Sequence, residues 1–352
     1  MIKDNLLLDY DDPILITGSN GFIGSKVVEK LLCYGFKNLR CFVRPSSTTT
    51  TLNKIISSFE NTQIEVIKGN LLSRDDCKKA TEGVSVIFHL AAGIEKSFPG
   101  AYMNSVITTR NLLDATLNYK NLKRFLNVSS FAVYSNLKIK RGGLLDETCE
   151  VESQPEQGGE AYCYAKVKQD ELVLEYNKKY DIPYVIVRPG VVYGPGKHTI
   201  TGRVGIGTFG IFLHLGGSNR IPFTYVDNCA DAIIMAGIKK GVDGEIFNIV
   251  DDDLPRSRKF LRMYKKNVRH FKSIYIPYRV TYILCYLWEK YSKWSEGQLP
   301  LAFNRRRCAT EWKGNRYSNE KLKNLLGWKP KIPLDEALKL YFDYCRKNGG
   351  YN

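Results

Sequence analysis

Residues 14–28 read Ile14-Leu15-Ile16-Thr17-Gly18-Ser19-Asn20-Gly21-Phe22-Ile23-Gly24-Ser25-Lys26-Val27-Val28 and set the fold of this chain. A short apolar run turns through glycines and then opens a helix with apolar residues at helical spacing. Strand, glycine turn and helix N-terminus together form an anion site, because glycines let the backbone approach a pyrophosphate and helix N–H groups point at it. The spacing is Gly-x-x-Gly-x-x-Gly rather than Gly-x-Gly-x-x-Gly. A ligand-free glycine turn is the alternative, and the strand–helix context favours dinucleotide binding.

The composition is that of an ordinary globular protein. The 352 residues are 43% hydrophobic and 25% charged, which suits one large domain or two interlocked ones. No apolar stretch is long enough to span a bilayer, and the first residues lack the order of a signal peptide, so we expect a cytoplasmic protein. Nine scattered cysteines without a Cys-x-x-Cys pair indicate reduced packing residues, and four dispersed histidines predict no metal site.

The formal net charge of +16 calls for a partner or a surface role. Lysine and arginine are spread along the chain without a nucleic-acid reading motif, so we expect no nucleic acid. An anionic small substrate such as a diphosphate fits this charge, and so does weak attraction to an anionic membrane surface. A solubilising basic surface accounts for most of the excess.

Strand-like and helix-like segments alternate through the first 190 residues, as in βαβ units on a parallel sheet. A second strand over residues 39–43 ends at Arg44, about twenty residues past the glycines, where an acidic residue usually binds the adenosine ribose. A guanidinium suits a 2′-phosphate, so NADP(H) is favoured over NAD(H). The alternative is an arginine that stacks on adenine without selecting for the phosphate.

Tyr162 and Lys166 are four residues apart in a helix predicted over 161–179, which places them on one face. An ammonium near a phenol favours the phenolate and lowers its pKa from about 10. Ser130, at the end of a predicted strand, could hydrogen-bond a substrate carbonyl or alcohol and orient it for proton exchange with Tyr162. Tyr164 and Lys168 repeat the spacing, but Tyr164 as the acid would leave Lys166 without its partner.

The decisive pattern is a set of motifs that occur in a fixed order. They are Thr17-Gly18-x-x-Gly21-Phe22-Ile23-Gly24, His89-Leu90-Ala91-Ala92, Ser129-Ser130, Tyr162-x-x-x-Lys166 and Arg188-Pro189-Gly190-x-x-Tyr193-Gly194-Pro195-Gly196. With this set the chain resembles the extended short-chain dehydrogenase/reductases, usually called NAD-dependent epimerase/dehydratases. The resemblance runs from residue 14 to the C-terminal end.

The resemblance implies an α/β fold, a Rossmann-like doubly wound parallel sheet with a smaller C-terminal α/β substrate-binding domain. The NAD(P)-binding domain is expected over residues 1–190, with 221–250 returning to it. The substrate-binding domain is expected over residues 191–220 and 251–352. Relatives dimerise through helices that correspond to 102–118 and 161–179, so a homodimer is expected.

The resemblance also assigns site residues. Ser130, Tyr162 and Lys166 are expected to be catalytic, with Asn104 in support. Cofactor contacts are expected from Gly18, Asn20, Gly21, Phe22, Ile23, Gly24, Arg44, Asn70, Leu71, Leu90, Ala91, Ala92, Tyr162, Lys166, Pro189 and Val192. Asn70 departs from the family, in which an Asp commonly binds the adenine amino group. Its amide oxygen can still accept that bond, without the charge.

The residues after Ser130 narrow the set of reactions that the protein could catalyse. Sugar-nucleotide 4,6-dehydratases need an acidic pair there, whereas this chain has Phe131 and Ala132, so we do not expect a dehydratase. Hydride transfer at a carbinol or carbonyl carbon remains, by a nucleotide-sugar 4-epimerase or a ketoreductase. Arg203 and Arg305 are expected to bind the substrate diphosphate, with a solvated basic turn as the alternative for each.

Residues 276–294 support a different substrate. An apolar stripe at helical spacing is formed by Val280, Ile283, Leu284, Leu287, Trp288 and Tyr291. Most such stripes belong to core helices, but the aromatic content and nearby lysines also fit a membrane interface. This region resembles the 3β-hydroxysteroid dehydrogenase and dihydroflavonol reductase branches, so an NADPH reductase of an apolar carbonyl compound is the alternative. Exposure of Trp288 or Tyr291 would favour it; convergence of Arg203 with residues 305–307 would favour the nucleotide sugar.

A hypothesis of another class is a catalytically silent NADP(H)-binding regulator. The intact set of Ser130, Tyr162 and Lys166 argues against it.

Overall fold

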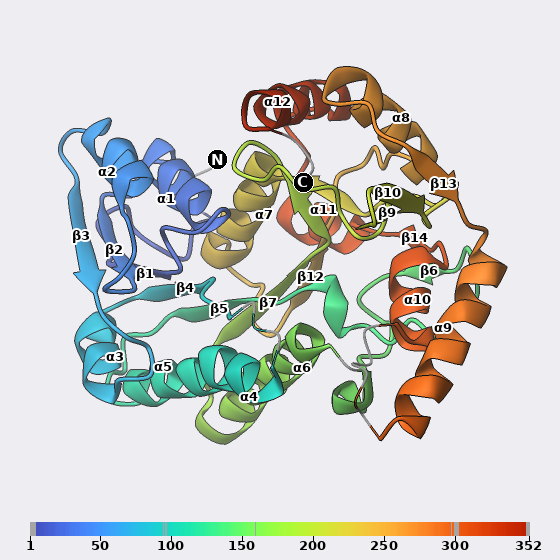
Figure 1. The fold of residues 1–352 in the computed structure, drawn as a ribbon. Coiled ribbons are helices and arrows are strands. Elements are labelled where there is room, and N and C mark those ends of the chain that lie inside the picture. Colours follow the sequence, from blue (N-terminus) through green and yellow to red (C-terminus); the bar gives the residue numbers. More distant parts are fainter. Residues whose placement is uncertain are drawn as a thin grey trace.

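Seven parallel strands form the central sheet of this computed structural model, which describes residues 5–93, 95, 97–158, 160–296, 298 and 303–349. Their order is β12-β7-β5-β4-β1-β2-β3 (Figure 1). The strands are β1 (Ile14–Thr17), β2 (Asn38–Val43), β3 (Gln63–Lys68), β4 (Val86–His89), β5 (Arg124–Val128), β7 (Tyr184–Pro189) and β12 (Ile246–Ile249). The chain order reverses between β1 and β4, which is where ligands bind in doubly wound sheets. The predicted Rossmann-like fold is confirmed.

Helices cover both faces of the sheet (Figure 1). One face carries α1 (Gly24–Cys33), α2 (Thr50–Ser57) and α7 (Val226–Ile238), and the other carries α3 (Arg74–Thr81), α5 (Thr108–Thr116) and α6 (Ala161–Tyr180). Side chains alternate along each strand, so Ile14 and Ile16 enter the core beneath α1, whereas Leu15 enters the core beneath α5 and α6. Burial on both faces explains why these strands are almost continuously apolar.

Two short parallel pairings join distant parts of the chain. The strands β8 (Val191–Tyr193) and β11 (Phe223–Tyr225) pair beside the sheet, and β6 (Leu144–Leu145) pairs with β14 (Arg316–Tyr317). The single-turn helices η3 (Phe131–Val133) and η4 (Pro155–Gly158) lie in the segment after β5. The β6–β14 pairing attaches the C-terminal elements to the segment that follows Ser130.

The remaining elements lie toward the right and top of Figure 1. A three-stranded sheet has the order β13-β10-β9, from β9 (Gly205–Thr208), β10 (Ile211–His214) and β13 (Ser273–Tyr275). The helices are α8 (Ser257–Asn267), α9 (Tyr278–Trp294), α10 (Arg305–Trp312), α11 (Glu320–Leu326) and α12 (Leu334–Lys347). Across the described ranges, the search for a helix that could cross a membrane finds none.

Candidate active site

The glycine turn between β1 and α1 lies against the end of β4. Gly18 has a φ of +67°, and a Cβ there would lie 2.9 Å from the Ala91 nitrogen. A Cβ on Gly24 would lie 2.0 Å from the Gly18 carbonyl oxygen, so the first turn of α1 packs directly on the glycine turn. No side chain caps the N-terminus of α1 at Ile23, although the Ser25 N–H donates to the Gly21 carbonyl at 3.0 Å, so the positive end of the helix dipole faces the turn without a competing side chain. The turn therefore fits a dinucleotide pyrophosphate.

Two predicted cofactor residues tie this turn to neighbouring loops. Asn20 Nδ2 donates a 2.7 Å hydrogen bond to the Thr48 carbonyl in the loop after β2. The Phe22 ring lies beneath Lys197, whose Nζ is 4.8 Å from the ring centroid. The turn is thus held between the segments that follow β2 and β8.

The residues predicted near the adenosine lie at the ends of β2 and β3. Arg44 follows β2, is exposed, and has no side-chain partner within the described ranges. The Asn70 Oδ1 accepts from the Leu72 nitrogen at 3.0 Å, so the atom expected to bind adenine already closes a local turn. Leu71 is buried beneath it. The contacts of these residues with a cofactor stay predictions.

Ser130 and Tyr162 come together at the carboxyl end of β5. Ser130 caps η3, where its Oγ accepts from the Ala132 nitrogen at 3.2 Å. Tyr162 is in the first turn of α6, where burial raises its pKa and the hydrogen bond with Ser130 acts in the opposite direction. This pair can hold a substrate oxygen and exchange a proton with it.

Lys166 is one turn further along α6 and points beneath the end of β5. Its Nζ donates to the Val128 carbonyl at 2.7 Å and to Gln169 Oε1 at 2.8 Å, and burial lowers its pKa to about 8. We expected Lys166 to lower the pKa of Tyr162, and this expectation is wrong: that pKa is raised. The physical reason is that the ammonium is turned into the protein interior and bonded there.

A buried polar chain connects Lys166 with the glycine turn. Gln169 Nε2 donates to Thr109 Oγ1 at 2.7 Å, and Thr109 Oγ1 itself donates to the Ser105 carbonyl at 2.6 Å. Because the Thr109 hydroxyl proton is already donated to Ser105, His89 Nε2 must be the donor in its 2.8 Å hydrogen bond with Thr109 Oγ1. Burial lowers the His89 pKa to about 3, so the ring is neutral and its Nδ1 accepts from Thr17 Oγ1 at 2.7 Å.

Asn104 lies in a π-helical segment, η2 (Tyr102–Ile107), between α4 (Phe98–Ala101) and α5. We predicted a helix over 102–118 without this widened turn. Asn104 Nδ2 donates to Glu95 Oε1 at 3.2 Å, and a Cβ on Gly93 would lie 2.6 Å from the Asn104 Cβ. π-Helical turns are rare and occur often at functional sites. The turn therefore sets Asn104 directly against the segment that follows β4.

The predicted substrate arginines lie apart. Arg203 Nη1 donates to the Thr310 carbonyl at 2.6 Å and to Tyr317 Oη at 3.2 Å. Arg305 instead pairs with Glu289 of α9 at 3.0 Å. The arginine that shares a site with Arg203 is Arg307, which lies 3.3 Å from Glu160. Burial raises the pKa of Glu160, and both guanidinium groups partly oppose this rise.

A small cavity adjoins Arg307 and residues close in sequence to Ser130 and Tyr162. It is lined by Ala132, Cys163, Glu160, Arg306 and Arg307, among others; Cys163 directly follows Tyr162, and Ala132 is two residues after Ser130. Phe131, the other residue at the predicted dehydratase position, is buried and stacks on Tyr317. Neither Phe131 nor Ala132 can supply an acid beside Ser130.

Comparison with known proteins settles the family. Residues 14–250 match the family described as "NAD dependent epimerase/dehydratase family". The chain belongs to this family. It is therefore an enzyme of the short-chain dehydrogenase type that uses a nicotinamide dinucleotide.

Individual members of the epimerase/dehydratase family similar to this chain differ in reaction. A mouse sterol-4-alpha-carboxylate 3-dehydrogenase, decarboxylating, is 26% identical, with 92% of this chain and 88% of the relative covered. An uncharacterised UDP-glucose epimerase of Bacillus subtilis is 28% identical, with 67% and 76% covered. The structure of a UDP-glucuronic acid 4-epimerase from Bacillus cereus with UDP-glucuronic acid and NAD has a TM-score of 0.71 at 23% identity, with 96% and 99% covered. That likeness shows the fold.

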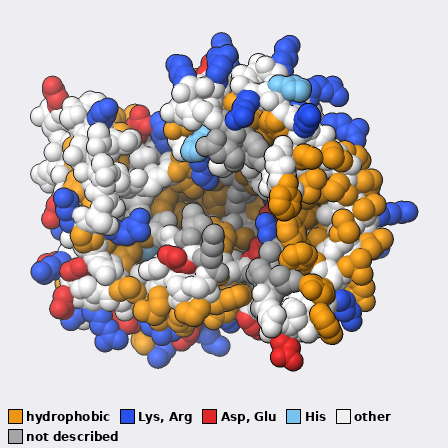
Figure 2. Space-filling view, in the orientation of Figure 1, with side chains coloured by type: hydrophobic (Ala, Val, Ile, Leu, Met, Phe, Trp, Pro, Cys, Tyr) orange, Lys and Arg blue, Asp and Glu red, His pale blue; other side chains and the backbone are white. Residues whose placement is uncertain are grey.

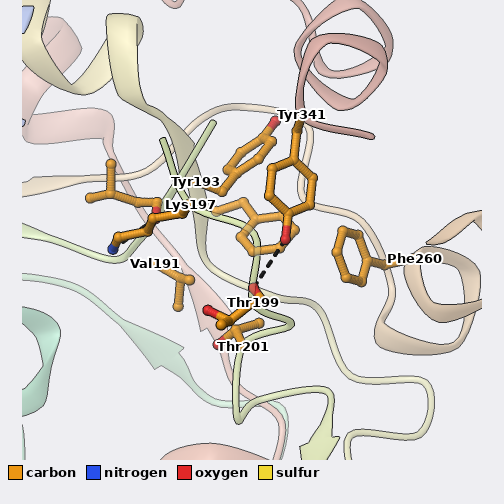
Figure 3. A pocket seen from close by; sticks show the side chains of 9 residues that line it. Val191, Tyr193, Lys197, Thr199, Thr201, Phe260 and Tyr341 are labelled. Atoms are coloured by element: carbon orange, nitrogen blue, oxygen red, sulfur yellow. Dashed lines mark hydrogen bonds between the residues drawn. The ribbon is translucent and has the colours of Figure 1, made fainter. Parts of the chain in front are cut away.

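In this family member a second cavity, of about 170 Å³, lies beside β8 (Figure 3). Val192 of β8 and the rings of Tyr193, Phe260 and Tyr341 line this cavity. Val192 is a predicted cofactor contact, as is Pro189 at the end of β7. The Tyr341 hydroxyl donates to the Thr199 carbonyl at 3.0 Å, which closes one wall. The Lys197 side chain points away from these rings in Figure 3.

Sequence reasoning missed Gln169 and Thr109, which hold Lys166. It considered residues 305–307 together but named Arg305, whereas Arg307 is the one that shares Glu160 with Arg203. His89 and Thr17 lay within the quoted motifs, but nothing in the spacing showed that their side chains bond to each other. Among the described ranges, the search for groups of His, Cys, Asp and Glu that could hold a metal ion finds none.

Proposed function

We propose that this enzyme transfers hydride at a carbinol or carbonyl carbon of a nucleotide sugar, as a 4-epimerase or a ketoreductase, without dehydration. The observation that carries the proposal is the Ser130–Tyr162 pair at the end of β5, followed by the apolar Phe131 and Ala132. The pair can exchange a proton with an alcohol, but neither Phe131 nor Ala132, which follow Ser130, is a carboxylate that could remove water from the oxidised product.

The chain's own groups divide this work. Tyr162 takes or returns the proton of the substrate hydroxyl, and Ser130 holds the same oxygen in place. Burial gives Tyr162 a raised pKa, so it is protonated at neutral pH and begins as the acid in the reducing direction. When bound, the nicotinamide supplies or accepts the hydride. The glycine turn and the uncapped N-terminus of α1 would hold its pyrophosphate.

Arg203 and Arg307 support an anionic substrate. Both act on Glu160 beside the cavity that adjoins Cys163, and guanidinium groups bind phosphates through paired hydrogen bonds. The Bacillus cereus epimerase of similar fold binds UDP-glucuronic acid, which carries such a diphosphate. Arg305 is the less suitable residue because Glu289 neutralises it.

We further propose NADP(H) as the preferred cofactor, because the exposed Arg44 at the end of β2 has no competing partner within the described ranges.

The proposed homodimer would form through η2, α5 and α6, where Met103 and Leu174 are exposed. Sedimentation of the wild type against Leu174→Glu tests the dimer, which the variant should dissociate.

The function is tested by incubating the enzyme with NADP⁺ or NAD⁺ and UDP-glucuronic acid or UDP-glucose and following carbon 4 by proton NMR. Inversion at this carbon indicates an epimerase, whereas a net change in NAD(P)H absorbance indicates a ketoreductase or dehydrogenase. Tyr162→Phe serves as the control. Loss of the 6-hydroxyl of UDP-glucose as water would contradict the proposal.

The second candidate is reduction of an apolar carbonyl compound. Its supporting observation is the exposure of Tyr291 and most of the α9 stripe, together with the near full-length similarity to the sterol dehydrogenase. Trp288 is half-buried and packs on Phe303. An absorbance assay with NADPH and hydrophobic ketones, run beside the nucleotide-sugar assay, separates the two, because Arg203→Ala should weaken turnover of a nucleotide sugar and leave turnover of a neutral ketone unchanged.

A further inference from the structure

Helix α9 carries its large apolar side chains on the solvent side. The residues that it buries are small or polar, Thr281, Cys285 and Ser292. The predicted stripe was expected to face a core or a membrane interface, and apart from the half-buried Trp288 its members are exposed. Amphipathic helices that only pack on a protein core show the reverse arrangement.

The exposed stripe is long and continuous. Val280, Ile283, Leu284, Leu287, Tyr291 and Trp294 follow helical spacing over four turns, and Ile283, Leu287 and Trp294 are 57%, 54% and 77% exposed. Figure 2 shows hydrophobic side chains gathered along the right-hand edge, where Figure 1 places α9. Single exposed apolar residues are ordinary, but a contiguous patch of this kind marks an interaction surface.

Positive charge surrounds this stripe. Arg279, Lys290 and Lys293 are exposed on α9 itself. The only carboxylate within α9 is Glu289, which is mostly buried and is paired with Arg305 and Lys293. The next one along the chain, Glu296, lies past the end of the helix. The exposed face of α9 is therefore apolar and cationic.

We propose that α9 docks this enzyme on an anionic lipid surface, with the helix axis in the plane of the interface. The leucine and isoleucine side chains would enter the acyl boundary, and Tyr291 and Trp294 suit the headgroup level because each combines an apolar ring with a polar atom. Lysine and arginine stems lie along the apolar layer while their charges reach the lipid phosphates. The net charge of +16 adds a general attraction.

A second copy of this chain fits the same face less well. Pairing two α9 helices would bring Arg279, Lys290 and Lys293 of one copy near the same cations of the other, without an exposed carboxylate on either helix to compensate. An anionic lipid surface matches both the apolar stripe and the charge.

Docking would place the lipid surface next to the substrate side of the enzyme. Tyr282, Glu289 and Lys293 of α9 line a cavity of about 490 Å³ on the protein side of the helix. Arg306 lines both this cavity and the smaller one beside Ala132 and Cys163. The proposal holds for either substrate class, since it concerns where the enzyme lies rather than what it converts.

Vesicle flotation tests the proposal directly. The wild type should float with phosphatidylcholine vesicles that contain phosphatidylserine and much less with phosphatidylcholine alone. The double variant Ile283→Glu/Leu287→Glu should lose at least tenfold in affinity. The matched control Leu325→Glu/Leu340→Glu changes two leucines of 41% and 40% exposure on α11 and α12 and should bind as the wild type does.

Trp294 provides a second readout that does not depend on substituting leucines. It is the most exposed tryptophan of the described residues, since Trp312 and Trp328 are buried and Trp288 is half-buried. Fluorescence should shift to the blue when phosphatidylserine vesicles are added, and Trp294→Phe should remove most of this shift. Arg279→Glu/Lys290→Glu should weaken binding by about 25-fold or more, from about fivefold for each lost cation.

Three results would overturn the proposal. The first is equal flotation of the Ile283→Glu/Leu287→Glu variant and the wild type, and the second is absence of any lipid-dependent shift of Trp294. The third is a lipid-free dimer that this variant dissociates, which would assign the stripe to a second copy.

Discussion

The Nζ of Lys166 lies 2.8 Å from Oε1 of Gln169, and this bond joins Lys166 to a buried series of hydrogen bonds that ends at Thr17, the last residue of β1 before the glycine turn. Each polar atom along the chain has a direction assigned by its neighbours, with His89 as a neutral donor to Thr109. Loss of one member of such a buried hydrogen-bond network leaves its neighbours unpaired and destabilises the protein. Gln169 bonds Lys166 and Thr109, so we expect it to position Lys166 without touching the substrate.

Gln169→Leu should lower kcat by at least tenfold and destabilise the protein by about 1–3 kcal/mol, because Lys166 and Thr109 each lose a buried partner. Gln169→Glu keeps an acceptor for Lys166 and should retain more activity than the leucine variant. Steady-state kinetics and urea unfolding measure the two effects. Equal kcat in both variants would contradict a positioning role.

Lys166 also predicts a pH dependence of stability. Burial lowers its pKa from 10.5 to about 8, so below pH 8 both the folded and the unfolded state hold the proton and the cost of burying the charge is fully present. Between about pH 8 and 10.5 the unfolded state binds the proton more readily, and the Lys166 contribution to stability rises by up to about 1.4 kcal/mol per pH unit. The measured quantity is the wild-type free energy of unfolding minus that of Lys166→Met. A difference that stays flat across this range would show that Lys166 titrates normally.

Tyr162→Phe should lower turnover at least about a thousandfold, because the proton carrier is removed, whereas cofactor affinity should fall only slightly, because the variant loses one hydroxyl among many expected cofactor contacts. Activity with each NAD(P) form and fluorescence titration with NADPH check both halves of this expectation. Tyr164→Phe is the matched control, because Tyr164 packs on Phe98 and Tyr102 instead of facing Ser130. Loss of activity in the control alone would reassign the catalytic tyrosine.

Gly18 and Gly83 form a natural pair for testing the glycine turn. Both have a φ of +67°, but a Cβ on Gly18 would lie 2.9 Å from the Ala91 nitrogen, whereas a Cβ on Gly83 would meet nothing within 4 Å. Both alanine variants should lose stability because alanine is strained at this positive φ. The free energy of unfolding of Gly18→Ala should fall by about 1–3 kcal/mol more than that of Gly83→Ala, because its Cβ overpacks against Ala91. Thermal unfolding measures the difference. Similar losses would mean that the turn can shift away from β4.

Arg44→Ala should weaken NADPH binding about tenfold to a hundredfold and leave NADH binding nearly unchanged, because one charge-assisted hydrogen bond to the 2′-phosphate is lost. Competitive fluorescence titrations with both nucleotides provide the comparison. Wild-type protein that retains NAD tightly through purification would instead favour an epimerase cycle and would argue against the proposed role of Arg44.

The fold was predictable because its signals are local. The glycine spacing at residues 18–24 and the apolar strands each report on their own segment, and parallel order follows from the alternation of elements. The polar chain was not predictable, because Thr17, His89, Thr109 and Gln169 come from four different elements and meet only after the sheet and helices assemble.

The arginine that lies with Arg203 and the exposed side of α9 could not be predicted, for a related reason. Consecutive residues on a helix point about 100° apart, so the sequence of residues 305–307 cannot tell which one shares a site with Arg203. Periodicity likewise revealed the apolar stripe of α9, but it does not say which side of a helix faces the protein. Both answers depend on the rotation of a helix about its axis, which packing alone sets.

The π-helical segment at Asn104 carries one residue more in its turn than an α-helix of the same rise. Deleting one residue from 102–107 would let the helix continue in α geometry, yet it would turn all side chains upstream of the deletion by about 100° relative to α5. Asn104 would no longer contact Gly93, although the helix would still form. A single-codon insertion in a straight α-helix is thus sufficient to bring this side chain against Gly93, and a single-codon deletion is sufficient to remove it from there.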